Sequence, residues 1–591
     1  MVPFALTPWG PCAAGRLSSI VLTAGAAQRA APSFSQPRFR APHWSPGRTG
    51  LSLGALAAAL LLAVPVAVIV ASLALPRDEV WEHVGGTVLP QYVANTALLL
   101  LGVGAGVLVL GTAAAWLVTM CRFPGSRTLE WALLLPMAMP AYLMAYTYTD
   151  LLDVTGPVQT ALRAWTGLGV RQYWFPPIRS LGGAIAVMAL VFYPYVYLLA
   201  RAAFLEQSVC VLEASRTLGR GPWRSFLGVA LPLARPALVA GLTLALMEAL
   251  ADFGTVEYFA VDTFTTGIFR SWFGMDSRLT AAQLAALLLL AVLAVKSLER
   301  LARGGARFHH TSLRYRHLVP YRLRGLRALA ALLVCAAPVI LGFFVPAGAL
   351  ARLSLTGGDR LAGALFPRLA ANSLLLAALA GALAVLLSVA MAASLRFAPG
   401  WPTRIATAVA TLGYAVPGSV IAVGVLATTG FADNALDRWM RAAFNHPTGL
   451  LLSGTIVALV FAYLVRFLAV AFHTVEAGLS KIRPSMEDAA RTLGRGPLGA
   501  LAAVHAPLMR GSVLTAGLLV FVEVMKELPA TLIVRPFNFD TLAVRVYRLA
   551  ADERLAEAST PALAIVAVGV LPVVLLSIAI ARSRAGNTAA A

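Results

Sequence analysis

The sequence is poor in lysine, acidic residues and cysteine, and these shortages exclude several classes of protein. Its three lysines are Lys296, Lys481 and Lys526. None completes the Gly-x-x-x-x-Gly-Lys-Ser/Thr pattern with which a P-loop cradles phosphates, so the chain is not expected to bind ATP in that way. Its four cysteines are Cys12, Cys121, Cys210 and Cys335. Because no two form a Cys-x-x-Cys pair, a disulfide framework and a zinc site are both disfavoured.

Long apolar runs dominate the chain instead. Apolar residues make up 59% of the 591 residues, charged residues make up 12%, and the mean hydropathy is +0.79. This composition excludes a soluble globular protein and indicates a multi-span membrane protein. The net charge of +21 comes almost entirely from arginine. Because the arginines cluster in loops between apolar runs, membrane lipid is the expected partner and nucleic acid is not.

The apolar runs predict about twelve transmembrane helices, since about 20 apolar residues are needed to cross the hydrocarbon core. In the first half the predicted spans are approximately 52–75, 93–119, 129–152, 180–204, 233–253 and 279–298. In the second half they are approximately 326–350, 369–395, 403–430, 449–473, 509–533 and 560–582. Landmarks that match the halves are Asn95-Thr96 with Asn372-Ser373, and Pro124-Gly125 with Pro399-Gly400. An even number of spans per half makes the repeats parallel, and the predicted fold class is all-α.

Composition and span positions predict five parts. They are a disordered basic tail at 1–50, a six-span domain at 51–298, a basic linker at 299–325, a second six-span domain at 326–584, and a tail at 585–591. The first tail has no acidic residue and too little apolar surface to offset the entropy of ordering. The linker is rich in arginine and holds a single acid, Glu299, so it and both termini are expected to be cytoplasmic.

One polar segment between spans occurs twice. The copies are Glu213-Ala-Ser-Arg-Thr-Leu-Gly219-Arg-Gly-Pro222 and Asp488-Ala-Ala-Arg-Thr-Leu-Gly494-Arg-Gly-Pro497. Subtracting 213 from 488 and 222 from 497 gives 275 both times, so the repeat is free of gaps. Apolar residues at spacings of three and four precede each Gly, which predicts a helix, a tight turn at the Gly, and a short second helix up to Pro232 or Pro507.

This repeated segment resembles the EAA loop of ABC-importer permeases. In that family the loop is a coupling helix that docks into the cytoplasmic ATPase subunit. By this resemblance the ATPase-coupling residues are Glu213, Ala214, Gly219, Pro232, Asp488, Ala489, Gly494 and Pro507. The second copy departs from the motif, with Asp488 where the motif has Glu and with Ala506 before Pro507. The two docking sites are therefore expected to be unequal.

The resemblance also implies partners and a location. Two copies of a separate cytoplasmic ATPase would drive transport, and a periplasmic binding protein would deliver the substrate. The chain itself would be a multi-pass permease of the bacterial inner membrane, a transport subunit rather than an enzyme, with no cofactor, no catalytic residue and no metal site.

Two stretches of the first half resemble the ferric-iron uptake subgroup of these permeases. They are Leu135 to Leu162, which includes Tyr146-Thr-Tyr148 and Gly156-Pro-Val-Gln, and Ala251 to Gly274, which includes Ala251-Asp-Phe-Gly. Thiamine and polyamine importers share the architecture and stay as alternatives. Six tyrosines suit either a ferric ligand set or a belt at the membrane interface, namely Tyr142, Tyr146, Tyr148, Tyr193, Tyr195 and Tyr197.

Two functions of other classes were weighed against an importer permease. A major-facilitator secondary transporter also has parallel six-span halves, but it has no helix–turn–helix insert after the fourth and tenth spans. A polytopic membrane enzyme needs a catalytic cluster, and no such cluster recurs in the sequence. A neighbouring gene for an ATPase without spans would separate these classes.

Acidic residues recur inside the otherwise apolar fifth and eleventh predicted spans. Glu248 and Asp252 lie four residues apart, and Glu523 and Glu527 repeat them at the same offset of 275. Charges within a membrane normally face the bundle interior or a water-filled cavity, so the four carboxylates are predicted to line a cation pathway around one axis. Alternatively, they sit at the ends of their helices and pair with Lys526 or with loop arginines.

Overall fold

The computed structural model describes residues 46–170, 172–206, 215, 217, 219, 221–303, 321–357 and 362–583. The chain divides into two units, Met1–Ser45 and Pro46–Ala591, and the fold below is that of the second unit. The predictions for the N-terminal tail up to residue 45, for most of the linker, for the C-terminal tail, and for Glu213 and Ala214 lie outside the described residues. The first helix begins at Pro46, inside the range that composition assigned to the tail.

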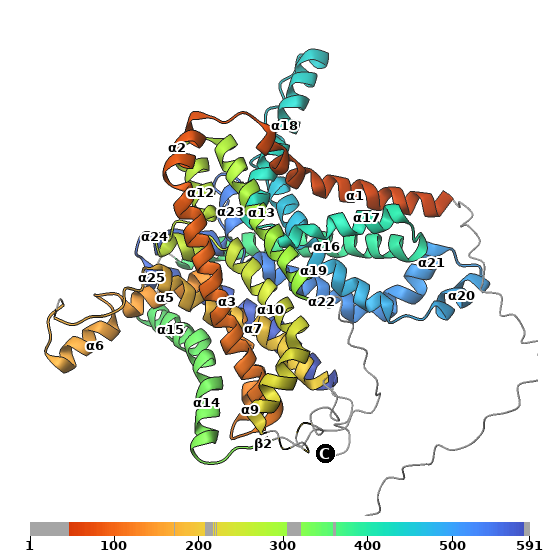
Figure 1. Cartoon of the computed structure of the whole chain (residues 1–591). Coiled ribbons are helices and arrows are strands. Elements are labelled where there is room, and N and C mark those ends of the chain that lie inside the picture. Colours follow the sequence, from red (N-terminus) through yellow and green to blue (C-terminus); the bar gives the residue numbers. More distant parts are fainter. Residues whose placement is uncertain are drawn as a thin grey trace, which may run out of the picture. The chain divides into compact units, whose positions relative to one another are not determined.

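Helices make up almost all of the described chain, as the sequence predicted (Figure 1). In the first half they are α1 (Pro46–Ala71), η1 (Ser72–Ala74), α2 (Glu79–Thr87), α3 (Leu89–Met120), α4 (Ser126–Ala132), η2 (Leu135–Ala138), α5 (Ala141–Leu152), α6 (Pro157–Thr166), α7 (Leu181–Glu206), α9 (Pro222–Ser225), η3 (Phe226–Ala230), α10 (Leu231–Ala251), α11 (Gly254–Tyr258), α12 (Phe264–Phe269), η4 (Arg270–Gly274) and α13 (Arg278–Arg303).

The second half repeats this order. Its helices are α14 (Leu326–Val339), η5 (Ile340–Phe344), α15 (Val345–Gly357), α16 (Ala362–Phe397), α17 (Trp401–Ala410), η6 (Leu412–Ala415), α18 (Gly418–Phe444), α19 (Ile456–Ser480), α20 (Pro484–Thr492), α21 (Pro497–Ala500), η7 (Leu501–His505), α22 (Ala506–Met525), α23 (Pro529–Val534), α24 (Leu542–Ala551) and α25 (Leu555–Ser583).

Eleven helices of the described chain are long and apolar enough to cross a membrane, or up to twelve if one bent pair counts as a span. The prediction of about twelve spans is confirmed, but both predicted third spans are wrong as continuous helices. The span at 129–152 is a pair bent by 92° between Ala138 and Ala141, and the span at 403–430 breaks before α18. A proline follows each break, Pro140 or Pro417, and proline disfavours helical backbone in the residue before it.

Three spans form the packed core of each half. In the first half α3, α7 and α10 pack on one another, and in the second half the equivalent helices α16, α19 and α22 do the same. Glycines allow the close approach: a Cβ on Gly111 or Gly241 would lie 2.7 Å from Val196, and one on Gly381 would lie 3.2 Å from the Gly517 carbonyl oxygen. Small residues at such contacts are the usual means of bringing membrane helices together.

The first helix of each half packs on the opposite half. Helix α1 lies against α16, α17 and α18 of the second half, whereas α14 and α15 lie against α3, α4 and α5 of the first (Figure 1). A Cβ on Gly424 of α18 would be 2.5 Å from the Pro65 carbonyl oxygen in α1, which shows how close this exchanged contact is. The halves are therefore consecutive in sequence but interlocked in space.

Two short strands, which the sequence did not predict, join the linker to the first half. Strands β1 (Cys121–Arg122) and β2 (Tyr321–Arg322) pair in parallel, with Arg122 beside Arg322, and the Leu323 amide donates to the Arg122 carbonyl at 3.0 Å. The linker is thus tied to the end of α3 immediately before it enters α14.

Candidate translocation cavity and coupling segments

A cavity of about 100 Å³ lies between the two halves. Its lining includes all four carboxylates that the sequence singled out, which are Glu248, Asp252, Glu523 and Glu527. Two cations, Arg466 and Lys526, also line it, together with apolar residues such as Phe192 and Phe467. Four carboxylates against two cations leave a formal charge of −2 on the cavity wall.

The two carboxylates of the first half have different surroundings. Glu248, inside α10, accepts a hydrogen bond at 3.2 Å from the hydroxyl of Tyr414, a residue of η6 in the opposite half. Asp252 follows the last residue of α10 and accepts bonds from the Thr255 amide at 2.9 Å and from the Thr255 hydroxyl at 3.0 Å. Asp252 therefore caps α11, while Glu248 joins the two halves.

In the second half both carboxylates have a cationic partner. Glu523, inside α22, pairs with Lys526 at 2.8 Å. Glu527 accepts from Arg466 of α19 at 2.8 Å, from the Ala530 amide at 2.8 Å, and from the Thr531 hydroxyl at 2.5 Å. Glu527 is 5% exposed, and it caps α23 as Asp252 caps α11.

The structure thus brings the four carboxylates together but corrects part of their predicted placement. Asp252 and Glu527 lie just beyond their helices rather than within them, and Glu523 does pair with Lys526, as the alternative interpretation held. The role of the four in translocation stays a prediction. Sequence reasoning missed Arg466 and Tyr414, although a lone arginine within the apolar run of α19 is a detectable signal. Among the described residues, no three His, Cys, Asp or Glu side chains are grouped as a metal site.

The second coupling segment has the predicted helix and turn. Helix α20 ends near Leu493, and Gly494 has a φ of +77°, a left-handed conformation that glycine adopts at little cost. Asp488 and Ala489 are exposed on α20, and the Asp488 carboxylate accepts from Arg491 at 3.3 Å. Pro507 is exposed on α22. The predicted short second helix is wrong, because α21 continues through the π-turn η7 into α22 without a stop at Pro507.

The first coupling segment shares the turn but is tied differently. Gly219 has a φ of +75°, and the segment after it again continues, through α9 and η3, into α10, where Pro232 is exposed. The buried hydroxyls of Ser215 and Ser225 are hydrogen-bonded at 2.8 Å, so the arms on either side of the turn are joined. The second copy has buried alanines, Ala490 and Ala500, at these positions.

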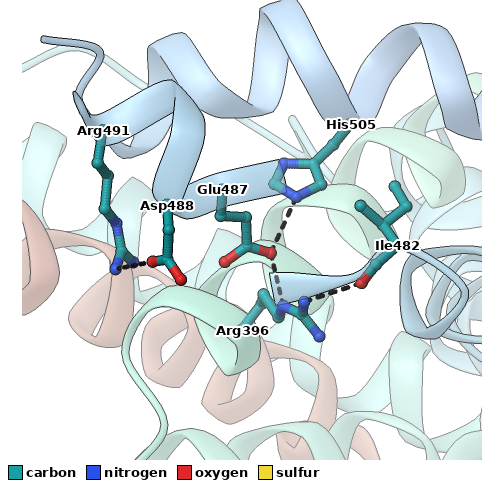
Figure 2. Close-up of polar contacts among 6 residues, drawn as sticks. All are labelled: Arg396, Ile482, Glu487, Asp488, Arg491 and His505. Atoms are coloured by element: carbon teal, nitrogen blue, oxygen red, sulfur yellow. Dashed lines mark hydrogen bonds and ion pairs between the residues drawn. The ribbon is translucent and has the colours of Figure 1, made fainter. Parts of the chain in front are cut away.

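A buried polar cluster that sequence reasoning missed anchors the second segment (Figure 2). Glu487, on α20, is 6% exposed and accepts from Arg396 Nε at 2.7 Å. The same oxygen lies 3.1 Å from Nε2 of His505, which is fully buried. Arg396 also donates to the Ile482 carbonyl at 3.0 Å. The motif acid Asp488 points elsewhere, toward Arg491 (Figure 2).

The six tyrosines fall into three kinds of surroundings, and their contact with substrate stays a prediction. The hydroxyls of Tyr148, Tyr193 and Tyr197 donate to the carbonyl oxygens of Leu341, Leu133 and Glu130 at 2.6, 3.0 and 2.6 Å, and so tie helices together inside the protein. Tyr142 and Tyr195 line the cavity. Tyr146 is fully buried and packs on Tyr258 at a ring-centre distance of 4.5 Å.

Equivalent contacts at the other ends of the core spans confirm that the halves are related. The Asn95 side-chain amide donates to the Asp262 carbonyl at 2.9 Å, and the Asn372 amide donates to the Asp540 carbonyl at 3.0 Å. Asp262 then pairs with Arg270, and Asp540 with Arg548. A twofold-repeated helical bundle with a shared charged cavity and a left-handed glycine turn in each half is the architecture expected of a membrane permease.

Comparison with known proteins assigns this permease to a family. Residues 107–304 match the binding-protein-dependent transport system inner membrane component family. The sulfate transport system permease protein CysT of Escherichia coli is 34% identical over 221 residues, which cover 36% of this chain and 76% of that protein. The chain belongs to this family, as its repeated segment predicted, and is the permease of a binding-protein-dependent importer.

Two further relatives differ in how much of the chain they match. The Fe(3+)-transport system permease protein FbpB 2 of Haemophilus influenzae is 27% identical over 498 residues, or 83% of this chain and 90% of that protein. The molybdenum transport system permease protein ModB of Escherichia coli is 31% identical over 145 residues, or 24% of this chain and 60% of that protein.

Proposed function

We propose that this permease imports a cation, ferric iron, across the bacterial inner membrane. The observation that carries the proposal is the wall of the cavity, where four carboxylates face two cations. A net negative wall at low dielectric attracts a passing cation and repels an oxyanion such as sulfate or molybdate. The relative named for Fe(3+) transport also matches both halves of the chain, whereas the sulfate and molybdenum relatives match about a third of it or less.

Transport is driven by a separate cytoplasmic ATPase, bound in two copies, and a periplasmic binding protein delivers the substrate. Met486, Ala489 and Leu493 support an ATPase-docking role for α20, since they recur at helical spacing and are exposed. Exposed apolar side chains on a segment outside the spans are typical of an interaction surface.

The cavity charge is tested with Glu248→Gln/Glu523→Gln in the complete complex of permease, ATPase and binding protein. Glutamine keeps the shape and hydrogen bonding of glutamate but removes its charge. We expect ferric uptake to fall about tenfold or more, since the loss of a charged interaction costs roughly 1.5–3 kcal/mol. Glu476→Gln, an exposed site on α19 outside the cavity, is the matched control and should transport normally.

The same assay separates the candidate substrates. Uptake of sulfate or molybdate by the parental complex would contradict the cation proposal, and uptake of thiamine or a polyamine would replace iron by that cation. Unchanged iron uptake in the double variant would reject a role for these two charges.

The proposed orientation, with both termini cytoplasmic, has its own test. A reporter active only in the periplasm should be active when fused after Phe264 and silent when fused after Arg314. The opposite pattern would reverse the topology, and with it the cytoplasmic position of both coupling segments.

A further inference from the structure

The buried cluster around Glu487 joins the second coupling segment to two spans. Arg396 lies at the end of α16, and His505 lies in η7 at the start of the span that continues as α22. Arg396 also donates to the Ile482 carbonyl, which belongs to the connection between α19 and α20. One carboxylate on α20 thus meets groups from two of the three core spans of the second half (Figure 2).

The helix that begins at this cluster ends at the cavity. Helix α22 starts directly after His505 and carries Glu523 near its far end, with Lys526 and Glu527 just beyond it. Because Glu487 links α20 to the start of this helix, a displacement of α20 is transmitted along one continuous helix to the cavity wall.

Burial of these polar groups costs folding free energy, which indicates a role other than stability. Glu487 and His505 are 6% and 0% exposed, and His505 Nδ1 has no hydrogen-bond partner among the described residues. A buried polar group with an unmet hydrogen bond destabilises the folded state, and apolar residues of similar volume often stabilise it more. The ring of His505 packs only its edge on Phe397, with ring centres 5.5 Å apart.

The positions of this cluster have other residues in the first half. At the offset of 275, the residues that correspond to Glu487 and His505 are Leu212 and Ala230, neither of which can form an ion pair. Among the described residues of the first segment, Ser215 and Ser225 are hydrogen-bonded, which joins the two arms of its own turn.

We propose that Glu487 is a positioning residue for energy coupling: it locks α20 to the end of α16 and to the start of the η7–α22 span, so that movement of the ATPase at this segment reaches the cavity. This inference rests on the proposed ATPase-driven function. Glu487 acts through the helices it joins and contacts neither the substrate nor ATP.

The experiment compares ATP hydrolysis with substrate uptake in the reconstituted complex. Glu487→Gln should keep insertion, ATPase binding and ATP hydrolysis but lower uptake per ATP by about five- to 150-fold, the usual range of a coupling between two sites. Arg396→Gln should do the same, and the two together should be no worse than either, because they break one interaction. Ser215→Ala should have a smaller effect, and Glu476→Gln should leave the ratio unchanged.

A second variant separates coupling from folding. Arg396→Met/Glu487→Leu/His505→Ala replaces all three members of the cluster by apolar residues, at 487 and 505 those of the first segment, and leaves no unpaired charge. It should restore the protein level and the thermal unfolding midpoint while uptake per ATP stays low. If it restores uptake per ATP as well, Glu487 is only structural and the inference is wrong.

The outcomes also distinguish the inference from the function on which it rests. A parental complex without ATP-driven uptake would overturn both. ATP-driven parental uptake, together with a fully coupled Glu487→Gln variant, would overturn the positioning role alone.

Discussion

The two halves share a scaffold but differ in how their coupling segments are anchored. The turn glycines Gly219 and Gly494 have nearly the same φ, +75° and +77°. Behind the turn, the first segment is closed by two serine hydroxyls, whereas the second is held to other spans by a buried carboxylate. The comparison teaches that the repeat preserves the backbone of the turn, whereas the side chains behind the turn have diverged.

The cavity shows the same divergence. Each half supplies two carboxylates at equivalent positions, but Arg466 and Lys526 both come from the second half. Their equivalents at the offset of 275 are Val191 and Ala251. The second half therefore supplies both cations of the cavity. It also supplies the buried carboxylate, Glu487, that holds its own coupling segment.

The largest expected effect comes from the turns, where the halves are alike. Gly219→Val and Gly494→Val each force a β-branched residue into a left-handed conformation, at a cost of about 1–3 kcal/mol. No atom lies within 4 Å of a Cβ at either site, so the strain is in the backbone and not in packing. Each variant should lose most ATP-driven uptake while its spans still insert, as measured by uptake and by membrane protein level.

Neighbouring glycines supply the control for this prediction. Gly221 and Gly496 have equally open surroundings and no positive φ, so Gly221→Val and Gly496→Val should be mild. Equal activity of Gly494→Val and Gly496→Val would show that the turn is not required.

A smaller effect is expected from moving the cavity cation between halves. Lys526→Ala leaves Glu523 unpaired and should lower uptake about tenfold, because a lost charged hydrogen bond costs roughly 1.5–3 kcal/mol. Adding Ala251→Lys restores the charge at the equivalent position of the first half. If uptake depends on keeping the formal charge of −2 on the cavity wall, and not on the pairing with Glu523, the double variant should transport better than Lys526→Ala alone.

The outcome of that swap sharpens the comparison. A double variant no better than Lys526→Ala would show that the pairing with Glu523 matters, and not the total charge. The asymmetry between the halves would then be a requirement for transport. Uptake of the same substrate under the same ATP supply is the measurement.

Loss of the equivalent asparagine hydrogen bonds, from Asn95 and from Asn372, should destabilise the two halves equally. Asn95→Ala and Asn372→Ala each remove one side-chain bond to a backbone carbonyl, which is worth about 1 kcal/mol. Their free energies of unfolding in detergent should fall by similar amounts. A difference of several-fold between them would show that the structural equivalence of the halves does not extend to energetics.

The smallest predicted effect is a pH dependence at Asp78, in the loop before α2 of the first half. Burial raises the pKa of Asp78, but hydrogen bonds from Ser277, Thr280 and the Trp81 amide outweigh it, so the pKa lies below its ordinary value of 3.8. A carboxyl group with a lowered pKa in the folded state stabilises the protein at pH values above its ordinary pKa. This stabilisation is lost as the pH falls through the folded-state pKa.

Asp78→Asn should therefore lower the unfolding midpoint slightly near neutral pH, and this difference should shrink as the pH falls below about 3.8. At the offset of 275 the second half has Leu353, inside α15. A uniform loss at every pH would mean that Asp78 acts by packing rather than by charge.

The sequence alone determined the class of fold, the number of spans and the turns. Apolar runs of about 20 residues need no tertiary context to be recognised, because any backbone in lipid must satisfy its own hydrogen bonds. Likewise, Gly219 and Gly494 fall at the turns because a left-handed conformation favours glycine locally. The offset of 275 also identified the four carboxylates that meet in the cavity.

Only the tertiary structure decided the cluster of Glu487 with Arg396 and His505 and the exchange of α1 and α14 between the halves. Apolar helices in a membrane have no hydrophobic preference for one neighbour over another, so hydropathy cannot say which half a span joins. That choice depends on close contacts such as Gly424 on the Pro65 carbonyl. The partners of Glu487 are likewise 91 and 18 residues away, brought together only when α16, α20 and η7 pack.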